Sequence, residues 1–343
     1  MAVSMSDVAR HAGVSQRTVS NVVNNYVHVS PTTRARVQAS LDALGYRPNT
    51  AARRLRTGRT GTVTLAVPTF SERYFADLAE AVIAAAQRRG TTVVVETTGG
   101  RHEAELELLH GGGDIVTDGL IMSAVNLSRA DERRLEDRRL KDRRLEDRKY
   151  PVVLVGDREP GSEIDHVGIK NREAAQAAVT HLLDTGRRRI LLLGANNGPR
   201  RSYQLRLQGY QAALKKHGIK LDPDLVVSCE WTTAAAAEAI TGLLGKPLPD
   251  GIFAMNDSAA LGAIRALVRA GIDVPGQVAV MGFDDIVESS LATPSLSTVA
   301  PLLDDIAGMA LDLLEEQFGA AGSHVPQHRM AGYELRLRES TTR

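Results

Sequence analysis

Apolar and polar positions along the first 45 residues follow a helical period and predict three short helices, at residues 4–12, 15–24 and 30–45. A serine stands at the start of each segment, where its hydroxyl can accept a hydrogen bond from a backbone amide. A glycine follows the first segment and another stands at the end of the third, as is common where helices end. Five apolar side chains of the first two helices are spaced to bury one another: Val8, Ala9, Val14, Val19 and Val22.

After residue 61, short apolar runs alternate with helical stretches, and this alternation predicts parallel sheets with helices on both faces. The runs form two successive series, which predict two lobes of an α/β body. Ligands of such folds bind beyond the carboxyl ends of the strands, which here would face a cleft between the lobes. The first series has strands expected at residues 62–68, 91–97, 119–124 and 151–157, and the second has them at 167–169, 188–195, 224–230, 251–256 and 278–285.

The 343-residue chain exceeds one ordinary domain, and its hydrophobic fraction of 43% with only 4% aromatic residues suits an Ala/Val/Leu-rich α/β core. Its net charge of +1 is unevenly divided. Residues 1–60 hold nine arginines and only two acidic residues, a net charge of +7, which leaves −6 for the remainder. A small basic head on a mildly acidic body indicates a polyanionic partner for the head alone.

The single cysteine, Cys229, excludes an internal disulfide and fits a reducing cytoplasm, and we expect a buried, inert thiol. The N-terminal residues MAVSMSDVAR lack the apolar region of a signal peptide, and no window approaches the about 18 apolar residues that a membrane span requires. We therefore expect a soluble, cytoplasmic protein with no membrane partner.

The second predicted helix leaves Gln16, Arg17, Ser20 and Asn21 pointing outward. Two helices joined by a glycine-containing turn, the second polar at its N-terminal end, are typical of a helix-turn-helix. Arginine and glutamine can each make two hydrogen bonds to base edges in the major groove of DNA. The alternative interpretation is a three-helix scaffold with a solvated polar face.

A further short helix is predicted in the segment YRPNTAARRLRTGRTG, which follows the third helix. Pro48 breaks the third helix, and Asn49 can cap the helix TAARRLR before a Gly/Thr/Arg-rich linker. An isolated helix of this length is marginal in water, and its three arginines would repel one another unless phosphates lay nearby. We expect it to form only on DNA.

The run SDVARHAGVSQRTVSNVVNN, continued by HVSPTTRARVQASLDALGYRPNTAARRL, resembles the head of the LacI/GalR family of bacterial repressors, and the family's order of elements continues to Arg343. The resemblance implies a major-groove position for the second helix and minor-groove pairing of the hinge helices of two subunits. It implies a helix-turn-helix DNA-binding domain at residues 1–46, a hinge helix and linker at 47–60, and a two-lobed effector-binding and dimerisation domain at 61–343.

The resemblance also assigns individual residues of the head to DNA. Leu55 matches the leucine that wedges between the central base pairs, and Arg53 on the same hinge helix belongs to the DNA-binding set. The base-reading positions are Gln16, Arg17, Asn21 and His28. The phosphate-contacting positions are Ser20, Asn24, Ser30, Thr33, Tyr46 and Asn49.

Aromatic and polar residues follow successive predicted strands of the body, where a cleft ligand would bind. Flat aromatic faces together with side chains able to hold paired hydroxyls are what a sugar requires. Structural alternatives remain open, since Tyr74 and Phe75 could belong to the core at a helix start and Trp231 could pack between lobes. The candidate effector-binding residues are Phe70, Tyr74, Phe75, Asp157, Arg206, Trp231, Asn256 and Asp284.

The body also resembles periplasmic sugar-binding proteins, and Arg206, Trp231, Asn256 and Asp284 match effector-contacting positions of the repressors. Two departures from the family pattern leave the identity of the effector, and its charge, open. The run VGIKN has Lys170 where the family has an aspartate, and TTAAAAEA lacks the glycine that is usual a few residues after the tryptophan.

The segment DERRLEDRRLKDRRLEDRKY, residues 131–150, repeats a five-residue unit. Leucines that recur every five residues are turned by about 140° from one another on a helix, so no apolar stripe forms. Opposite charges four residues apart support a solvated helix that projects from the first lobe. A partner-binding coiled coil is the alternative, although the heptad pattern is missing.

No P-loop, nucleophile elbow or dinucleotide-binding glycine motif is present in the sequence, and the nine histidines are scattered. We expect no catalysis, no metal site and no cofactor. The sequence predicts a homodimeric repressor that reads a pseudo-palindromic operator in double-stranded DNA. A small molecule in the cleft, for which a sugar is the leading candidate, switches its affinity for the operator. The alternatives are the same regulator controlled by a non-sugar ligand or a partner protein, and an enzyme or solute-binding protein that carries such a head.

Overall fold

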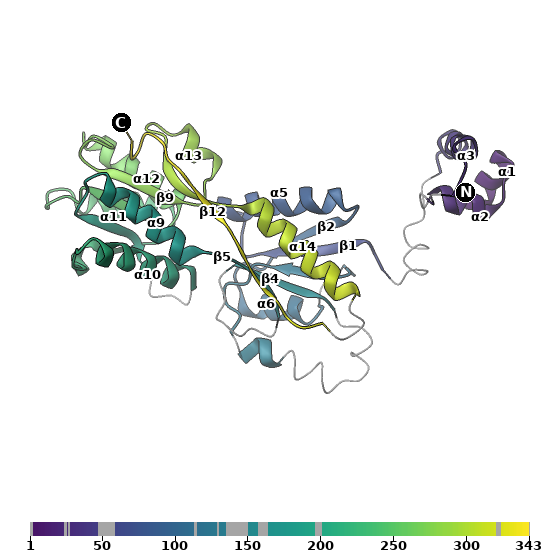
Figure 1. Ribbon diagram of the computed structural model, residues 1–343, viewed down its shortest axis with the longest axis horizontal. Coiled ribbons are helices and arrows are strands. Elements are labelled where there is room, and N and C mark those ends of the chain that lie inside the picture. The colour runs from purple at the N-terminus through teal and green to yellow at the C-terminus, as the bar shows by residue number, and fades with distance from the viewer. Residues whose placement is uncertain are drawn as a thin grey trace. The chain divides into compact units, whose positions relative to one another are not determined.

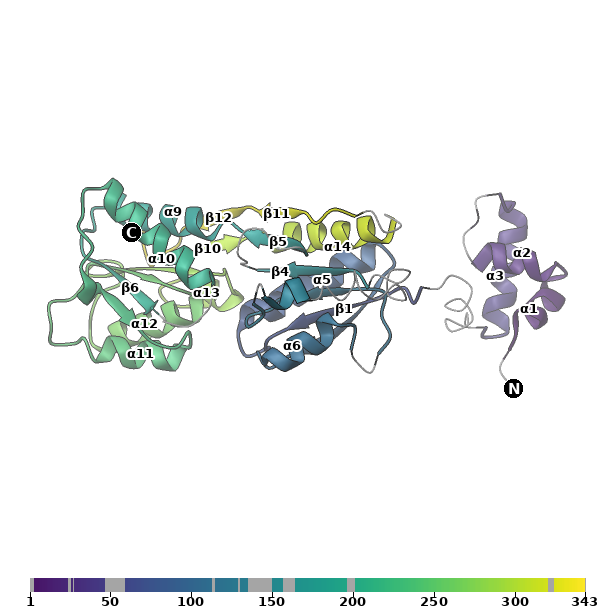
Figure 2. The same cartoon turned by 90° about the horizontal axis from the view of Figure 1, so that it is seen from below.

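The computed structural model divides into two compact units, Met1–Thr60 and Gly61–Arg343, which we call the head and the body (Figure 1; Figure 2). Each unit is described separately below. The structure describes residues 3–23, 26, 28–46, 59–112, 115–128, 130–134, 150–156, 164–195, 201–319 and 324–342.

The head contains the three predicted helices, α1 (Met5–Ala12), α2 (Gln16–Val23) and α3 (Pro31–Ala43). Ser4 and Asp7 form a capping box at the start of α1, in which each backbone amide donates to the other side chain. Gly13 ends α1 with a left-handed φ of 62°, which a side chain would disfavour. The buried residues of the head are Val8, Ala9, Ala12, Val19, Val22, Val37 and Leu41, with Val14 half-buried beside them.

The first sheet of the body has the strand order β11-β5-β4-β3-β1-β2, and all its described pairs are parallel. Residues on opposite sides of each strand meet different helices, so α5 and α14 cover one face and α6 covers the other. Its strands are β1 (Thr62–Val67), β2 (Thr92–Thr97), β3 (Leu120–Met122), β4 (Val152–Val155), β5 (Asp165–Ile169) and β11 (His328–Ala331). Its helices are α5 (Arg73–Arg88), α6 (His102–Leu109) and α14 (Leu303–Gly319).

The second sheet has the order β12-β10-β9-β8-β6-β7 and is parallel except for β12, which runs antiparallel to β10. Helices α9 and α10 cover one face, and α11 and α12 cover the other. Its strands are β6 (Ile190–Ala195), β7 (Val226–Ser228), β8 (Gly251–Ala254), β9 (Ala279–Phe283), β10 (Ser297–Pro301) and β12 (Tyr333–Arg336). Its helices are α9 (Asn171–Asp184), α10 (Arg201–Lys216), α11 (Thr233–Thr241), α12 (Asp257–Arg269), α13 (Val287–Leu291) and the 3-10 turn Pro223–Leu225.

The predicted two-lobed body with parallel sheets is confirmed, but one strand was placed in the wrong lobe. The run 167–169, expected in the second series, belongs to β5 of the first sheet. No element was predicted after residue 285, where α14 and β11 return to the first sheet and β10 and β12 complete the second. Figure 1 shows α14, in yellow, lying against α5 of the first lobe. The chain therefore crosses between the lobes three times, near residues 170, 302 and 332.

Two further expectations need correction. Cys229 is half-buried rather than buried, although burial raises the pKa of its thiol and so keeps it protonated and unreactive. In the charged repeat, Asp131 and Glu132 are buried rather than solvated. Residues 135–149 of that repeat lie outside the described residues.

Among the helices that the structure describes, none combines the length and the apolar character of a membrane span.

The close contact of α9 with α10 gives a first prediction. A Cβ at Gly209 would lie 2.3 Å from the carbonyl oxygen of Arg172 and 2.8 Å from Cβ of Ala175. Gly209→Ala should therefore lower the free energy of unfolding by about 1–3 kcal/mol, because two backbones must move apart. Urea unfolding followed by circular dichroism measures this change.

The matched control for Gly209 is Gly308 inside α14, where a Cβ would meet no atom within 4 Å. Gly308→Ala should raise the free energy of unfolding by up to about 1 kcal/mol through helix propensity. Equal unfolding midpoints for the two variants would contradict the tight α9–α10 packing.

Candidate functional site

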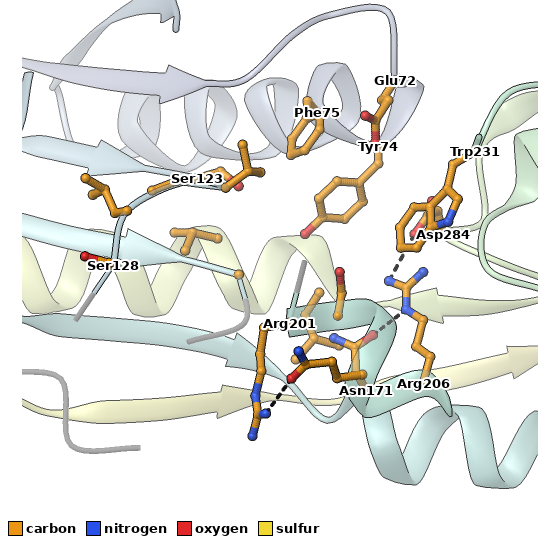
Figure 3. A pocket seen from close by; sticks show the side chains of 18 of the residues that line it. Glu72, Tyr74, Phe75, Ser123, Ser128, Asn171, Arg201, Arg206, Trp231 and Asp284 are labelled. Carbon is orange, nitrogen blue, oxygen red and sulfur yellow. Dashed lines mark hydrogen bonds and ion pairs between the residues drawn. The ribbon is translucent and has the colours of Figure 1, made fainter. Parts of the chain in front are cut away.

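A cavity of about 330 Å³ lies in the body, where the carboxyl ends of strands from both sheets meet (Figure 3). From the first lobe it is lined by Glu72, Tyr74, Phe75, Ser123, Ala124, Val125, Leu127, Ser128, Glu132, Val155, Gly156 and Ile169. From the second lobe and the crossing segment before it, the lining residues are Asn171, Arg201, Ser202, Gln204, Arg206, Trp231 and Asp284.

The structure brings most of the predicted effector residues together in this cavity. Those that line it are Tyr74, Phe75, Arg206, Trp231 and Asp284. Phe70 is 50% exposed and does not line it. Asn256 is buried behind the wall, where it caps α12 by accepting from the amide of Ala259 at 2.9 Å. Asp157 lies outside the described residues.

Arg206 contacts several groups in the wall of the cavity. Its Nε donates to Oδ1 of Asn171 at 2.6 Å, and its Nη1 donates to the carbonyl oxygen of Met255. Its Nη2 lies 3.7 Å from a carboxylate oxygen of Asp284, and the guanidinium stacks 3.5 Å from the ring centroid of Phe283. A planar guanidinium can satisfy these partners at once, whereas an ammonium cannot. The side chain is therefore held in one position.

Asp284 follows β9 with a φ of 119°, a conformation that L side chains rarely adopt. Burial raises the pKa of its carboxyl well above the ordinary value, and the nearby charge of Arg206 opposes this rise only in part. A carboxyl poised in this way can accept a hydrogen bond or, once protonated, donate one to a ligand.

Trp231 presents its indole to the cavity in a fixed orientation. Its Nε1 donates to the carbonyl oxygen of Gly194 at 2.8 Å, and Nδ2 of Asn256 donates to the carbonyl of Trp231 at 3.1 Å. A Cβ at Gly194 would lie 3.2 Å from Cδ1 of the indole, and the φ of 98° at this position is one that L side chains rarely adopt, so glycine favours this close approach. Asn256 thus acts on the cavity through the backbone of Trp231.

Asp257 positions the loop that carries Asp284. Its buried carboxylate accepts hydrogen bonds from the amide of Ile286 at 3.0 Å, from the Ser289 hydroxyl at 2.7 Å and from the Thr298 hydroxyl at 2.5 Å. Burial raises its pKa to about 6, and these three donors oppose the rise. Its partners lie 29 to 41 residues away, so no local pattern in the sequence marks this role.

Several lining residues were not predicted from the sequence. Ser123 directly follows β3 and Asn171 stands two residues after the end of β5, so the expectation that ligand residues follow strand ends could have found both. Ser128 lies in the connection after β3, where Asp131 accepts from its amide at 2.9 Å and from its hydroxyl at 2.6 Å. Burial disfavours the charged form of Asp131, yet hydrogen bonds from Ser128 and from His102 outweigh it and hold its pKa at about 2.

The predicted DNA-reading residues of the head lie on and around α2. Gln16, Arg17 and His28 are exposed, and Ser20 and Asn21 are half-exposed. Ser30 caps α3 by accepting from the amide of Thr33 at 3.3 Å, and Tyr46 packs half-buried against the core of the head. The remaining predicted residues, Asn24, Asn49, Arg53 and Leu55, lie outside the described residues.

Comparison with known proteins identifies both parts of the chain. Residues 4–49 match the family described as bacterial regulatory proteins, lacI family, and residues 179–341 match the periplasmic binding protein-like domain. The catabolite control protein A of Priestia megaterium is 31% identical over 315 residues, 92% of this chain and 92% of that protein. The chain belongs to the LacI family.

Solved structures extend the likeness of this LacI-family protein to the whole chain. A complex of the transcriptional regulator CelR with cellobiose is 30% identical with a TM-score of 0.68 and covers 98% of this chain and 99% of that one. The lac repressor dimer bound to operator and the anti-inducer ONPF is 25% identical with a TM-score of 0.79 over 99% of each chain. The relatives are transcriptional regulators, so this LacI-family protein is a DNA-binding transcriptional regulator and not an enzyme.

A comparison of two arginines of α10 gives a second prediction. Arg206→Leu leaves Asn171, the Met255 carbonyl and Asp284 without their partner and should lower the free energy of unfolding by about 3 kcal/mol. This decrease in unfolding free energy is near the lower end of the range for broken buried ion pairs, because Asp284 can become neutral by taking up a proton. Urea unfolding measures it.

Arg201→Leu serves as the control, because the Arg201 guanidinium bonds only to Oε1 of Gln204, at 2.9 Å, among the described residues. Its loss should change the free energy of unfolding by less than about 1 kcal/mol. Similar losses in the two variants would contradict the structural role assigned to Arg206.

Proposed function

We propose that this LacI-family protein is a homodimeric repressor whose affinity for a pseudo-palindromic operator is set by a sugar-like small molecule in the body. In this proposal residues 1–46 read DNA, residues 47–60 form the hinge and linker, and residues 61–343 bind the effector and dimerise. The protein acts in the cytoplasm, where its operator lies.

The observation that carries the proposal is the composition of the cavity. Tyr74 and Phe75 from one lobe and Trp231 from the other bring aromatic faces to it, while Asn171, Arg206 and Asp284 bring hydrogen-bonding groups. A small ligand with both hydroxyls and an apolar ring face fits such a lining. The volume of about 330 Å³ lies near the lower end of ligand pockets, which favours a ligand of monosaccharide size. The CelR relative, crystallised with cellobiose, supports the sugar class.

The head supports the DNA part of the proposal. Gln16 and Arg17 are the first two residues of α2 and are both exposed, which is where a recognition helix carries its base-reading side chains. Two heads of a dimer would read two half-sites about one helical turn apart. The solved lac repressor dimer on its operator supports this arrangement.

In this proposal, ligand binding in the cavity alters DNA binding by the head through a change in the arrangement of the two lobes. A ligand that contacts both lobes shifts the equilibrium only as far as it prefers one arrangement over the other. The crossings near residues 170, 302 and 332 are the natural hinges for such a change.

The proposal is tested with the purified full-length protein and a pool of palindromic DNA at fixed salt concentration. Fluorescence anisotropy is measured with and without a panel of mono- and disaccharides, and sedimentation reports whether the protein is a dimer. A change of at least tenfold in DNA affinity with one ligand, about 1.4 kcal/mol of coupling, is expected. Tight DNA binding that no sugar alters would instead favour control by a non-sugar ligand or by a partner protein.

A third prediction concerns base reading. Arg17→Ala should weaken binding to the selected operator by about 1–3 kcal/mol and change non-specific DNA affinity much less, because base-edge contacts carry sequence discrimination. Anisotropy with operator and with scrambled DNA separates the two quantities. Arg36→Ala, which removes an exposed arginine from α3, is the matched control and should leave the ratio of the two affinities unchanged. An equal loss on both DNAs in Arg17→Ala would assign Arg17 to phosphates instead.

A further inference from the structure

One buried polar atom of the cavity lacks a partner. Among the described residues, the Nε of Arg201 is the buried side-chain nitrogen or oxygen without a hydrogen bond. An unsatisfied buried donor is costly, and buried donors in native proteins are otherwise satisfied by protein, water, ions or ligands. Arg201 itself lines the cavity.

Arg201 and Arg206 of α10 differ in the number of partners that the described residues supply to their guanidinium groups. Arg206 is committed to Asn171, to the carbonyl of Met255 and to Asp284. Arg201 makes one neutral contact, from Nη1 to Gln204, and no carboxylate lies within 4.0 Å of it among the described residues. Among the described residues, the positive charge of this cavity-lining arginine therefore has no carboxylate partner.

The acidic residues of the cavity do not supply that counter-charge. Figure 3 shows Glu72 beside Tyr74 on the side of the cavity opposite Arg201. Asp284 lies next to Arg206, and Glu132 is buried and already engaged elsewhere in the protein. Of the described residues that line the cavity at the start of α10, Arg201 thus supplies an unpaired positive charge, and the hydroxyl of Ser202 adds a hydrogen-bond donor there.

We propose that the effector is an anionic sugar derivative whose oxyanion binds the guanidinium of Arg201. This inference rests on the proposed function and narrows its ligand class. A phosphate or carboxylate can accept two parallel hydrogen bonds from a guanidinium. The hydroxyls of the same ligand reach Asn171 and Asp284, and its ring faces the aromatic side chains.

The single tryptophan of the chain, Trp231, lines the cavity and reports binding through its fluorescence. The wild-type protein is titrated with glucose, fructose and ribose, each beside its terminal phosphate ester and its sugar acid, and with cellobiose. The ester and the acid distinguish phosphate from carboxylate as the source of the oxyanion. The same ligands are then added to the protein–DNA complex, and anisotropy is recorded.

Three variants complete the experiment. Arg201→Gln removes the charge, Arg201→Lys keeps it, and Lys215→Gln removes an exposed charge from the far end of the same helix. We expect one anionic ligand to bind at least tenfold more tightly than its neutral counterpart. Arg201→Gln should abolish that advantage while changing the affinity for the neutral sugar less than twofold. Arg201→Lys should retain part of the advantage, and Lys215→Gln should retain all of it.

The outcomes separate the two proposals. If a neutral sugar binds and regulates DNA affinity as well as its anionic counterpart, or if Arg201→Gln leaves the anionic ligand's affinity within twofold, the anionic class is wrong while the sugar-responsive repressor stands. If no ligand of the panel, neutral or anionic, changes either the fluorescence or the DNA affinity, both proposals fail together.

Discussion

The guanidinium of Arg206 joins parts of the body that are far apart in the sequence. It bonds to Asn171, just after β5 of the first sheet, and to the carbonyl of Met255 after β8 of the second, while the ring of Phe283 at the end of β9 covers its face. Because removing a charged group from water costs several kcal/mol, the buried guanidinium of Arg206 needs these partners to be stable in this position. The crossing segment near residue 170 and the wall of the cavity thus depend on the same side chain.

The two lobes of the body are joined by few connections. Each lobe has its own sheet and its own core, whereas the connections between them are the three crossings and the residues around the cavity. Packed cores resist deformation, so a change on binding is concentrated where packing is thinnest. In the proposed function, fixed side chains such as Trp231 and Arg206 give the ligand a rigid surface on one lobe, and Tyr74 and Phe75 contact it from the other.

In our proposal, Arg206 serves stability and Arg201, on the same helix α10, serves ligand recognition. Arg206 is satisfied by the protein itself and keeps Asp284 and Asn171 in position. Arg201, one and a half helical turns earlier, keeps a donor that the protein does not use. Both arginines line the same cavity. Because Arg206 is already paired with Asp284, the charge that remains for the proposed ligand is that of Arg201.

Local signals in the sequence were sufficient for the head, because capping serines, glycine stops and helical spacing act between residues close in the chain. They also located the strands of the body through residue 285 and the aromatic residues that line the cavity, Tyr74, Phe75 and Trp231. They did not determine that β5 belongs to the first sheet, since an apolar run looks alike in either lobe. Nor did they separate Arg201 from Arg206, because the partners of Arg206 lie 35 and 49 residues away and only the folded chain brings them within hydrogen-bond distance.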